Sequence, residues 1–385
     1  MKNKFFLFLL LVILLGSGFA TGFFFPYKNK TGAGKNGYAV KSDNSEDSVP
    51  SRKAKNIIFM VGDGMGLTQI YAGMTANKGH MNFERFKNIG FSKTYSSSSY
   101  ITDSAAGATA FSIGKKTFNG AIGLDKDSVA VKTILEMAEE NGLATGLVST
   151  SAITHATPAS FIAHNVTRDD EAGIALDFLK TDVDVFIGGG QSFFNLREDS
   201  LNLFDDLRKN GYEVATTIDE VAKSNSKKLA GLLAEDGMPK AGERGDMLAV
   251  SAKKAIDILK TNEKGFFLMI EGSQIDWAGH ANDPQWLIDE MLDFDKVMGE
   301  VLDFVKADGN TLLVITADHE TGGLTLNGGD LEKGTIDAKY TTGYHTAVMV
   351  PVFAYGPSSA NFRGIYENTA IFQKFLDAYQ MKNTQ

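Results

Sequence analysis

The chain has 385 residues, of which 38 are Lys or Arg and 47 are Asp or Glu, so its formal net charge is −9. This modest negative charge argues against nucleic acid as a dedicated partner, because phosphate backbones attract basic surfaces. The chain has no cysteine, which excludes a disulfide framework and a lipoprotein-type cysteine anchor.

The first 25 residues combine a basic start with a long apolar run. The run covers residues 5–25, and Gly18 and Ala20 offer the small residues of a cleavage site. We therefore expect residues 1–25 to be a signal peptide, or an N-terminal membrane anchor if they are retained, since roughly 20 apolar residues span a bilayer. Both alternatives predict export. Cleavage would give a periplasmic or secreted protein, and retention a membrane-anchored one.

Residues 26–52 are rich in Lys, Gly, Asn and Ser and lack a periodic apolar pattern, which is typical of a flexible linker. Residues 53–385 remain, and their length of about 330 suits one large α/β domain. We expect this domain to carry the chemistry.

Within this domain, short apolar runs alternate with longer amphipathic stretches. The expected strands are Ile57–Val61, Leu143–Ser149, Val183–Ile187, Phe266–Ile270, Leu312–Thr316 and Val350–Ala354. The expected helices are Leu67–Asn77, Val131–Asn141, Met247–Leu259, Pro284–Lys306 and Thr369–Tyr379. Continuous Val, Ile, Leu and Phe strands separated by helices predict a mostly parallel central sheet with helices on both faces.

Unusual polar residues follow three of these strands. Asp63 follows the first strand within a glycine-rich turn, Glu271 ends the fourth, and Asp318 and His319 follow the fifth. Ligands bind beyond the carboxyl ends of strands in such sheets. Acid and imidazole groups are therefore expected to meet at one edge of the sheet.

Three histidines lie among Asp, Gly and Thr rather than on apolar faces. Asp276 and His280 are four residues apart and would share one face of a helical turn, while His345 lies between Tyr344 and Thr346. A single histidine of this kind is more often structural, but three of them beside strand-end carboxylates favour a metal centre. Imidazole and carboxylate ligands without thiolates suit zinc, and an oxygen-only cluster suits magnesium.

The stretch from Thr102 to Ala110 contains the expected nucleophile, Ser104. Its small residues suit a closely packed helix that begins at this serine, and the N–H groups of the first turn would then face a bound anion. The alternative is that Asp103 and Ser104 only cap the helix. The metal-binding pattern elsewhere in the chain favours the nucleophile.

Several motifs share a specific order along the chain. They are Gly62-Asp63-Gly64-Met65-Gly66, Thr102-Asp103-Ser104-Ala105-Ala106, His155-Ala156-Thr157-Pro158-Ala159, Ala163-His164-Asn165-Val166-Thr167-Arg168, Glu271-Gly272-Ser273-Gln274-Ile275-Asp276, His280, Thr316-Ala317-Asp318-His319-Glu320 and His345-Thr346. In this order they closely resemble the alkaline phosphatase family. The resemblance implies that family's fold and an alkaline phosphatase activity on small-molecule phosphate monoesters.

The resemblance also implies two zinc ions and one magnesium ion. One zinc would be held by Asp276, His280 and His345, and the second by Asp63, Asp318, His319 and the Ser104 oxygen. The magnesium would be held by Asp63, Thr157 and Glu271. Ser104 would attack phosphorus and form a phosphoserine, Arg168 would grip two phosphoryl oxygens, and Asp103 would hold that guanidinium in place.

Two positions that vary within the family are His155 and Trp277, where some members carry Asp and Lys. We expect His155 to reach the magnesium only through its water, and Trp277 to lack the water-mediated phosphate contact of a lysine. The segment between Glu320 and His345 is short where many relatives carry an insertion. This predicts a more open site and a reduced contact in any homodimer.

Two other functions stay open at this point. A sulfatase or phosphodiesterase would share the superfamily, but Ser104 lacks the Pro-Ser-Arg context of sulfatases and differs from the threonine common in diesterases. A non-catalytic protein that binds metal or phosphate would not need a nucleophile, an arginine and a full set of metal ligands together, and this sequence contains all of them.

Overall fold

The computed structural model describes residues 52–385. The expected signal peptide or anchor, and all of the expected linker except Arg52, lie outside the described residues. Among the described helices, none is long and apolar enough to cross a membrane.

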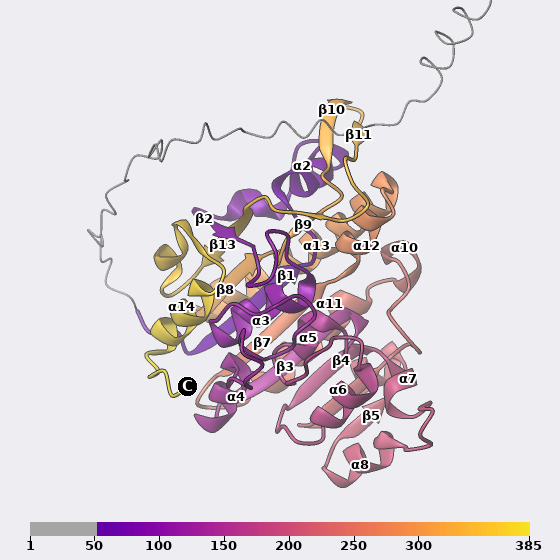
Figure 1. The fold of residues 1–385 in the computed structure, drawn as a ribbon, viewed down its shortest axis with the longest axis vertical. Helices are drawn as coiled ribbons and strands as arrows, with labels where there is room; N and C mark the ends of the chain where they lie inside the picture. The colour runs from indigo at the N-terminus through magenta and orange to yellow at the C-terminus, as the bar shows by residue number, and fades with distance from the viewer. Residues whose placement is uncertain (1–51) are drawn as a thin grey trace, which may run out of the picture. The chain divides into compact units, whose positions relative to one another are not determined.

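A ten-stranded sheet runs through the described part of the chain (Figure 1). Its strands, in spatial order, are β14 (Gly364–Glu367), β2 (Asn88–Lys93), β13 (Val350–Tyr355), β8 (Thr311–Thr316), β1 (Asn56–Gly62), β7 (Phe266–Gly272), β3 (Ala144–Ala152), β4 (Val185–Gly189), β6 (Leu229–Leu232) and β5 (Glu213–Ala215). Among these described strands, only β13 runs antiparallel to its neighbours. The predicted mostly parallel sheet is confirmed.

The strand β1 shows why both faces of the sheet are covered. Its residues are all buried, and they alternate between two apolar clusters, with Ile57 and Phe59 in one and Ile58 and Met60 in the other. Successive side chains of a strand point to opposite faces, so a continuous apolar strand requires helices on both sides.

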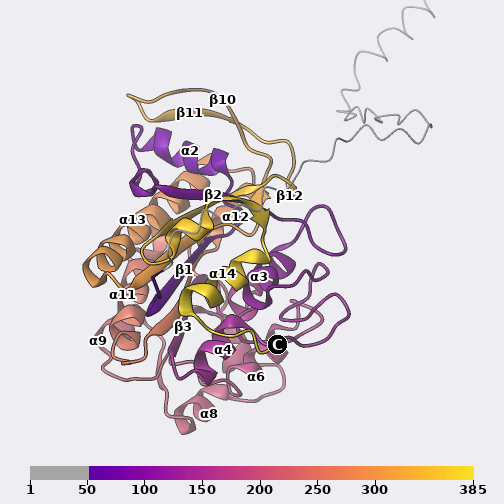
Figure 2. The same cartoon turned by 90° about the vertical axis from the view of Figure 1, so that its left-hand side faces the viewer.

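Figure 2 shows these two helical layers on either side of the sheet. The first cluster includes residues of α3 (Ser104–Ile113), α4 (Ile134–Glu140) and α14 (Ala370–Tyr379). The second includes residues of α2 (Leu67–Ala76), α11 (Met247–Leu259) and α13 (Pro284–Asp308). All six expected strands and all five expected helices are present; α11 has the expected bounds, and the others differ at one or both ends.

The clearest shift is the start of α4, which was expected at Val131 and begins at Ile134. Thr133 is its N-cap: the Thr133 hydroxyl accepts from the Glu136 N–H at 3.1 Å, and the Glu136 carboxylate accepts from the Thr133 N–H at 2.7 Å. This reciprocal pair satisfies two free donors at the helix start. The apolar spacing extended the predicted helix past its true cap.

The smaller elements connect these layers. They are η1 (Asn82–Arg85), α5 (Ala156–Ala159), α6 (Glu171–Asp177), α7 (Gln191–Phe194), α8 (Leu203–Lys209), α9 (Ile218–Lys223), α10 (Ala241–Arg244), α12 (Gln274–His280) and η2 (Ser359–Phe362). Two further strand pairs are β9 (Glu320–Thr321) with β12 (His345–Thr346), and β10 (Thr325–Asp330) with β11 (Thr335–Lys339). The β10–β11 hairpin packs on α2 (Figure 1).

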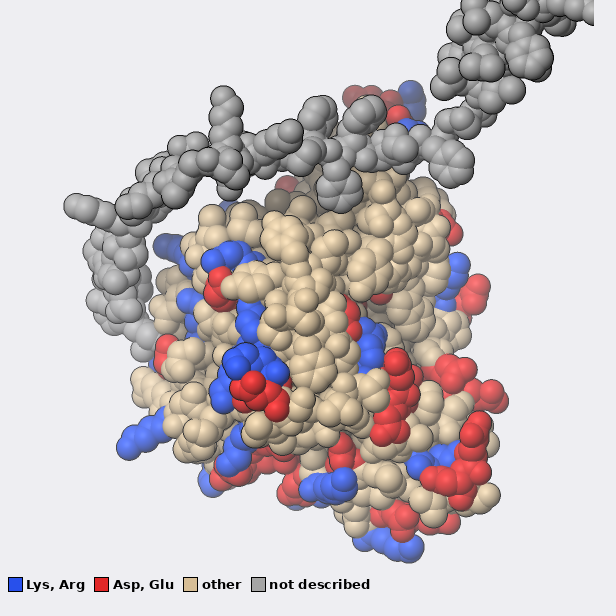
Figure 3. Space-filling model, in the orientation of Figure 1, with Lys and Arg blue, Asp and Glu red and all other residues tan. Residues whose placement is uncertain are grey.

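Charged side chains are mixed on the face drawn in Figure 3. Acidic and basic groups lie close together there, with broad uncharged surface between them. Exposed ion pairs such as Lys209 with Asp206, at 2.8 Å, stabilise a fold only weakly. The apolar core on the two sides of the sheet therefore supplies most of the stability.

Candidate active site

Three neighbouring strands end at the same level. Val61 of β1 is in register with Glu271 of β7 on one side and with Thr316 of β8 on the other. Asp63 and Asp318 therefore follow adjoining strand ends, and the Gly64 N–H donates to Asp318 Oδ1 at 3.2 Å. Asp63, Glu271 and Asp318 are all fully buried. The expected edge of acidic groups is present in the structure.

A first group of possible metal ligands consists of Asp276, His280 and His345. Asp276 and His280 lie one turn apart on α12, and His345 is brought beside them by the pairing of β12 with β9. His280 Nε2 is 3.4 Å from Asp276 Oδ2, and His345 Nε2 is 3.5 Å from Asp276 Oδ1. Their ligand atoms lie close enough together to hold one ion.

The orientation of the two imidazoles explains why a cation fits there. The Nδ1–H of His280 donates to the Gly343 carbonyl, and that of His345 donates to the Thr102 carbonyl, both at 2.8 Å. Their Nε2 atoms then face each other at 3.1 Å. In neutral rings both Nε2 atoms carry lone pairs, so a bound cation stabilises this arrangement.

A second group surrounds His319. Its Nε2 lies 3.2 Å from Asp318 Oδ2 and 3.5 Å from Asp63 Oδ1. Ser104 Oγ lies 3.2 Å from the same nitrogen. Asp63 Oδ1 and Asp318 Oδ2 are buried atoms without a hydrogen-bond partner. Buried carboxylate oxygens without donors are costly, and a metal ion removes that cost.

Oxygen ligands gather on the other side of Asp63. The Thr157 hydroxyl donates to Asp63 Oδ2 at 3.3 Å, and Ser149 donates to Glu271 Oε2 at 2.6 Å. Glu271 Oε1 is buried without a hydrogen-bond partner. This set has the oxygen chemistry that magnesium prefers. Ser149 was missed from the sequence, although it is in register with Glu271 at a strand end.

Burial and mutual repulsion shape the protonation of these acids. Burial, together with the neighbouring Asp318 charge, raises the pKa of Asp63 well above its usual range. Burial raises the pKa of Glu271 to about 7 and that of Asp318 to about 6. For Asp276, burial is outweighed by hydrogen bonds from His280 and His345, and its pKa is well below the usual range. Among these four acids, imidazole contacts outweigh burial only at Asp276.

Ser104 is the first residue of α3 and is only 2% exposed. The capping role belongs to Asp103, whose Oδ1 accepts from the Ala106 N–H at 3.0 Å. The hydroxyl of Ser104 is thus left to face His319. Gly107, one turn further, lies so close to Asp318 that an added Cβ would meet the Asp318 Cβ at 2.9 Å. Small residues therefore let α3 approach the strand-end acids.

Arg168 contacts Asp103, the residue that precedes Ser104. Its Nη1 is 3.5 Å from Asp103 Oδ2, and its Nη2 is 3.1 Å from His155 Nε2. Asp103 Oδ2 also accepts from the Gly120 N–H at 2.9 Å. The guanidinium is held at both ends, which fixes the plane of its donors for an anion.

The family model described as alkaline phosphatase matches residues 54–333. The chain belongs to the alkaline phosphatase family. It is 36% identical to alkaline phosphatase 3 of Bacillus subtilis over 414 residues, covering 85% of this chain and 89% of the relative.

Solved alkaline phosphatases show the same fold. The enzyme of the Antarctic bacterium TAB5 is 46% identical, with a TM-score of 0.82 over 86% of this chain and 100% of the other. A variant of that enzyme, 44% identical with the same coverage and TM-score, has Mg bound in its M3 site. The expected family, fold and enzyme class are confirmed: this chain is a phosphatase of a metal-dependent family.

In this alkaline phosphatase, the variable positions His155 and Trp277 lie side by side. Their rings meet edge to face with centroids 6.1 Å apart. Burial and the Arg168 charge lower the pKa of His155 to about 3, so the imidazole is neutral at physiological pH. His155 Nδ1 is buried without a hydrogen-bond partner. His155 therefore lies between the guanidinium of Arg168 and the indole ring of Trp277.

Glu320, which the sequence analysis placed in a motif without a role, and Thr321, which it did not identify, support the metal-binding groups. Thr321 contacts Asp276 and lies 3.2 Å from His319 Nδ1. Glu320 accepts from Gln69 Nε2 at 2.6 Å, and its other donors are the Gly323 and Leu324 N–H groups and the Thr346 hydroxyl. This buried carboxylate thereby ties α2 to the segments that carry His319 and His345. The position of Glu320 and Thr321 directly after His319 in the sequence is the signal that could have indicated their role.

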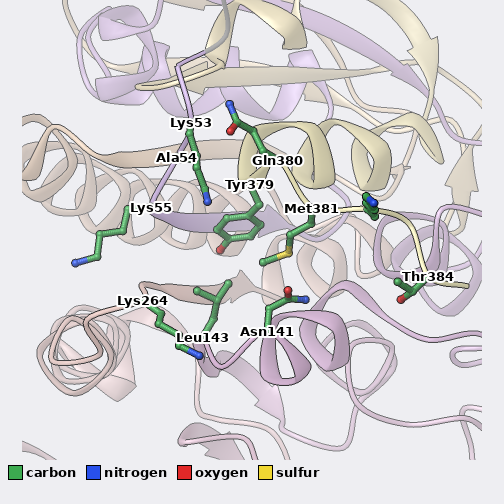
Figure 4. A pocket seen from close by; sticks show the side chains of 11 residues that line it. Lys53, Ala54, Lys55, Asn141, Leu143, Lys264, Tyr379, Gln380, Met381 and Thr384 are labelled. Atoms are coloured by element: carbon green, nitrogen blue, oxygen red, sulfur yellow. The ribbon is translucent and has the colours of Figure 1, made fainter.

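A cavity of about 560 Å³ lies at the opposite edge of the sheet, where β1, β3 and β7 begin (Figure 4). Lys53, Lys55 and Lys264 line it together with Tyr379 and Asn141. The helices α4 and α14 end at this cavity. Lysines beside helix C-termini balance the helix dipole, which gives them a structural role.

Proposed function

We propose that this enzyme hydrolyses small-molecule phosphate monoesters through a phosphoserine on Ser104, at a site with two zinc ions and one magnesium ion. The observation that carries the proposal is the position of Ser104. Its buried hydroxyl lies 3.2 Å from His319 Nε2. Nearby, Asp63 and Asp318 each have a buried oxygen without a hydrogen-bond partner. The preceding residue, Asp103, contacts the guanidinium of Arg168. Released inorganic phosphate would be the common product.

The donor sets fit the proposed ions. Asp276, His280 and His345 would hold one zinc; Asp63, Asp318, His319 and Ser104 would hold the other; Asp63, Thr157 and Glu271 would hold magnesium. Three buried carboxylate oxygens without donors support this division, one each on Asp63, Glu271 and Asp318. When bound, the ions supply Lewis-acid stabilisation of the attacking and leaving oxygens.

The protein's own groups then carry out two displacements at phosphorus. Arg168 binds two phosphoryl oxygens, with its orientation maintained by Asp103 and His155. Ser104 Oγ gives its proton to water and forms a bond to phosphorus, while the bond from phosphorus to the ester oxygen breaks and that oxygen takes up a proton from water. Water then attacks the phosphoserine, the bond from phosphorus to Oγ breaks, and Ser104 regains its hydroxyl. The burial of Ser104 limits competing water near the nucleophile.

Export is part of this proposal. Residues 53–385 would form the catalytic domain outside the cytoplasm, and residues 26–52 would link it to the N-terminal segment. Residues 1–25 would be either a cleaved signal or a retained anchor, and N-terminal sequencing of the mature protein distinguishes the two. Any homodimer would have a reduced contact, because the segment between Glu320 and His345 is short. Light scattering tests the oligomeric state.

The experiment that tests the activity compares three esters at a range of pH values. A chromogenic phosphate monoester, a matched diester and a sulfate ester are offered to chelated protein and to protein restored with zinc and magnesium. We expect metal-dependent monoester turnover that rises towards alkaline pH. Preference for the diester or the sulfate ester would overturn the monoesterase assignment. Phosphate binding without turnover under every condition would indicate a non-catalytic binder.

A further inference from the structure

Tyr344 is an aromatic side chain beside the imidazoles of the first ligand group. Its ring lies parallel to that of His345, with an interplanar angle of 6° and centroids 4.5 Å apart. Its centroid is 6.1 Å from that of His280. The residue is nevertheless 47% exposed. An aromatic surface that is open to solvent therefore lies directly next to two expected metal ligands.

The backbone holds this ring in place. The Tyr344 N–H donates to the Thr342 hydroxyl at 3.0 Å, and the Tyr344 carbonyl accepts from the Gly322 N–H at 2.9 Å. The next residue, His345, pairs with Thr321 in the β9–β12 ladder. A ring on a fixed backbone loses little conformational entropy when a ligand stacks on it.

The ligand group opens to solvent on the side of His280. The His280 side chain is 34% exposed, whereas those of Asp276 and His345 are nearly covered. Tyr344 lies against this exposed histidine. In the proposed reaction, Ser104 and Arg168 hold the phosphoryl group, and the leaving oxygen is directed to the group of Asp276, His280 and His345. The rest of the leaving group then extends past His280 towards solvent, where Tyr344 lies.

We propose that Tyr344 is a specificity-determining residue that stacks with planar leaving groups, so that aryl and nucleoside phosphates are preferred over small alkyl phosphates. This inference rests on the proposed function, because it assumes that the ester is cleaved at this site. Aromatic rings attract one another in offset or edge-to-face geometry beyond the burial of their area. A glycerol group has no planar ring and cannot make that contact.

The test compares kcat/KM for a nucleoside 5′-monophosphate and for glycerol phosphate, using holoenzyme with its zinc content measured. Tyr344→Ala is expected to lower the ratio of the two values by about 5- to 10-fold, mainly through a higher KM for the nucleotide. Tyr344→Phe keeps the ring and is expected to retain the ratio. Tyr71→Ala removes another exposed tyrosine, on α2, and serves as the matched control.

The outcomes separate the inference from the proposed function. Equal losses on both substrates, accompanied by loss of zinc, would show that Tyr344 only orients His345 and would overturn the inference. An unchanged ratio with full activity would overturn it as well. If the unmodified enzyme hydrolyses neither ester, the proposed function itself fails, independently of Tyr344.

Discussion

The Nε2 atoms of His280 and His345 face each other at 3.1 Å, although each ring already donates its Nδ1–H to a backbone carbonyl. This relationship is built by two distant segments, since α12 carries one histidine and β12 carries the other. Two lone pairs directed at one point define a position for a cation.

Chelated protein is expected to lose stability as the pH rises. Burial raises the pKa of Glu271 to about 7 and of Asp318 to about 6, above the values of the unfolded chain. A group with a raised folded pKa stabilises the fold at pH values below its unfolded pKa, and this contribution disappears as the pH rises through the folded pKa. Burial lowers the pKa of His155 and His319, which acts in the opposite direction up to the usual imidazole pKa of about 6.5. The melting temperature of chelated protein should therefore fall above about pH 6.5, as Glu271 and Asp63 ionise.

Protein restored with zinc and magnesium should not show this fall, because the ions balance the ionised acids. At a thousandfold excess over its dissociation constant, a bound ion adds about 4 kcal/mol to the free energy of unfolding. Differential scanning calorimetry of both forms across this pH range checks the prediction. Parallel melting curves for the two forms would contradict it.

Replacing the nucleophile should abolish turnover without emptying the site. Ser104→Ala is expected to lower kcat for a phosphate monoester by at least about 10³-fold, since no other group can form the phosphoserine. The zinc content should stay nearly unchanged, because the histidine and carboxylate ligands remain. Steady-state kinetics and metal analysis of the same sample measure both. Ser112, which is buried at the far end of α3, provides a matched Ser112→Ala control.

The ammonium group of a lysine should not be able to replace the planar guanidinium of Arg168. Arg168→Lys cannot keep the contact with Asp103 and bind two phosphoryl oxygens at once, so kcat/KM is expected to fall by about 10- to 100-fold. Competitive inhibition by inorganic phosphate should weaken in parallel. Arg208→Lys changes a surface pair on α8 and should leave both values unaltered. Full phosphate affinity in the Arg168 variant would refute the assignment.

The buried carboxylate of Glu320 should support both stability and metal retention. In Glu320→Gln, an amide NH2 replaces one acceptor and meets donors from Gln69, Leu324 or Gly323, so one buried donor is left unsatisfied. The free energy of unfolding is expected to fall by about 1–3 kcal/mol. Zinc should also dissociate faster, because Glu320 joins the segments of His319 and His345. Urea denaturation and zinc release into a chelator measure the two effects, with exposed Glu332→Gln as control.

The sequence predicted the central strands well because buried parallel strands are continuous apolar runs. It missed β2, whose residues alternate between buried, half-buried and exposed, and the short strands β5, β6 and β14. β14 and β5 are the edges of the sheet and lack a continuous apolar signal, while β6 has only four residues, too short for a clear apolar run. The helix start at Ile134 depended on the Thr133 cap, which apolar spacing does not reveal.

For the site, the strand-end position of Asp63, Glu271 and Asp318 was evident from the sequence, because glycines and polar residues interrupt apolar runs there. The role of Ser104 was ambiguous, since a serine at a helix start is also an ordinary cap. Only the tertiary structure shows that Asp103 takes the capping hydrogen bond and leaves the Ser104 hydroxyl facing His319.

By itself, the sequence determined the fold class, the family resemblance and the kinds of ligand available, because local patterns of polarity specify strands, turns and chemical groups. The tertiary structure alone decided which groups meet: His280 with His345, Arg168 with His155, and Glu320 with Gln69. Such contacts join residues that are 13 to 251 positions apart. Their distances depend on how the strands are ordered and packed, which no local pattern contains.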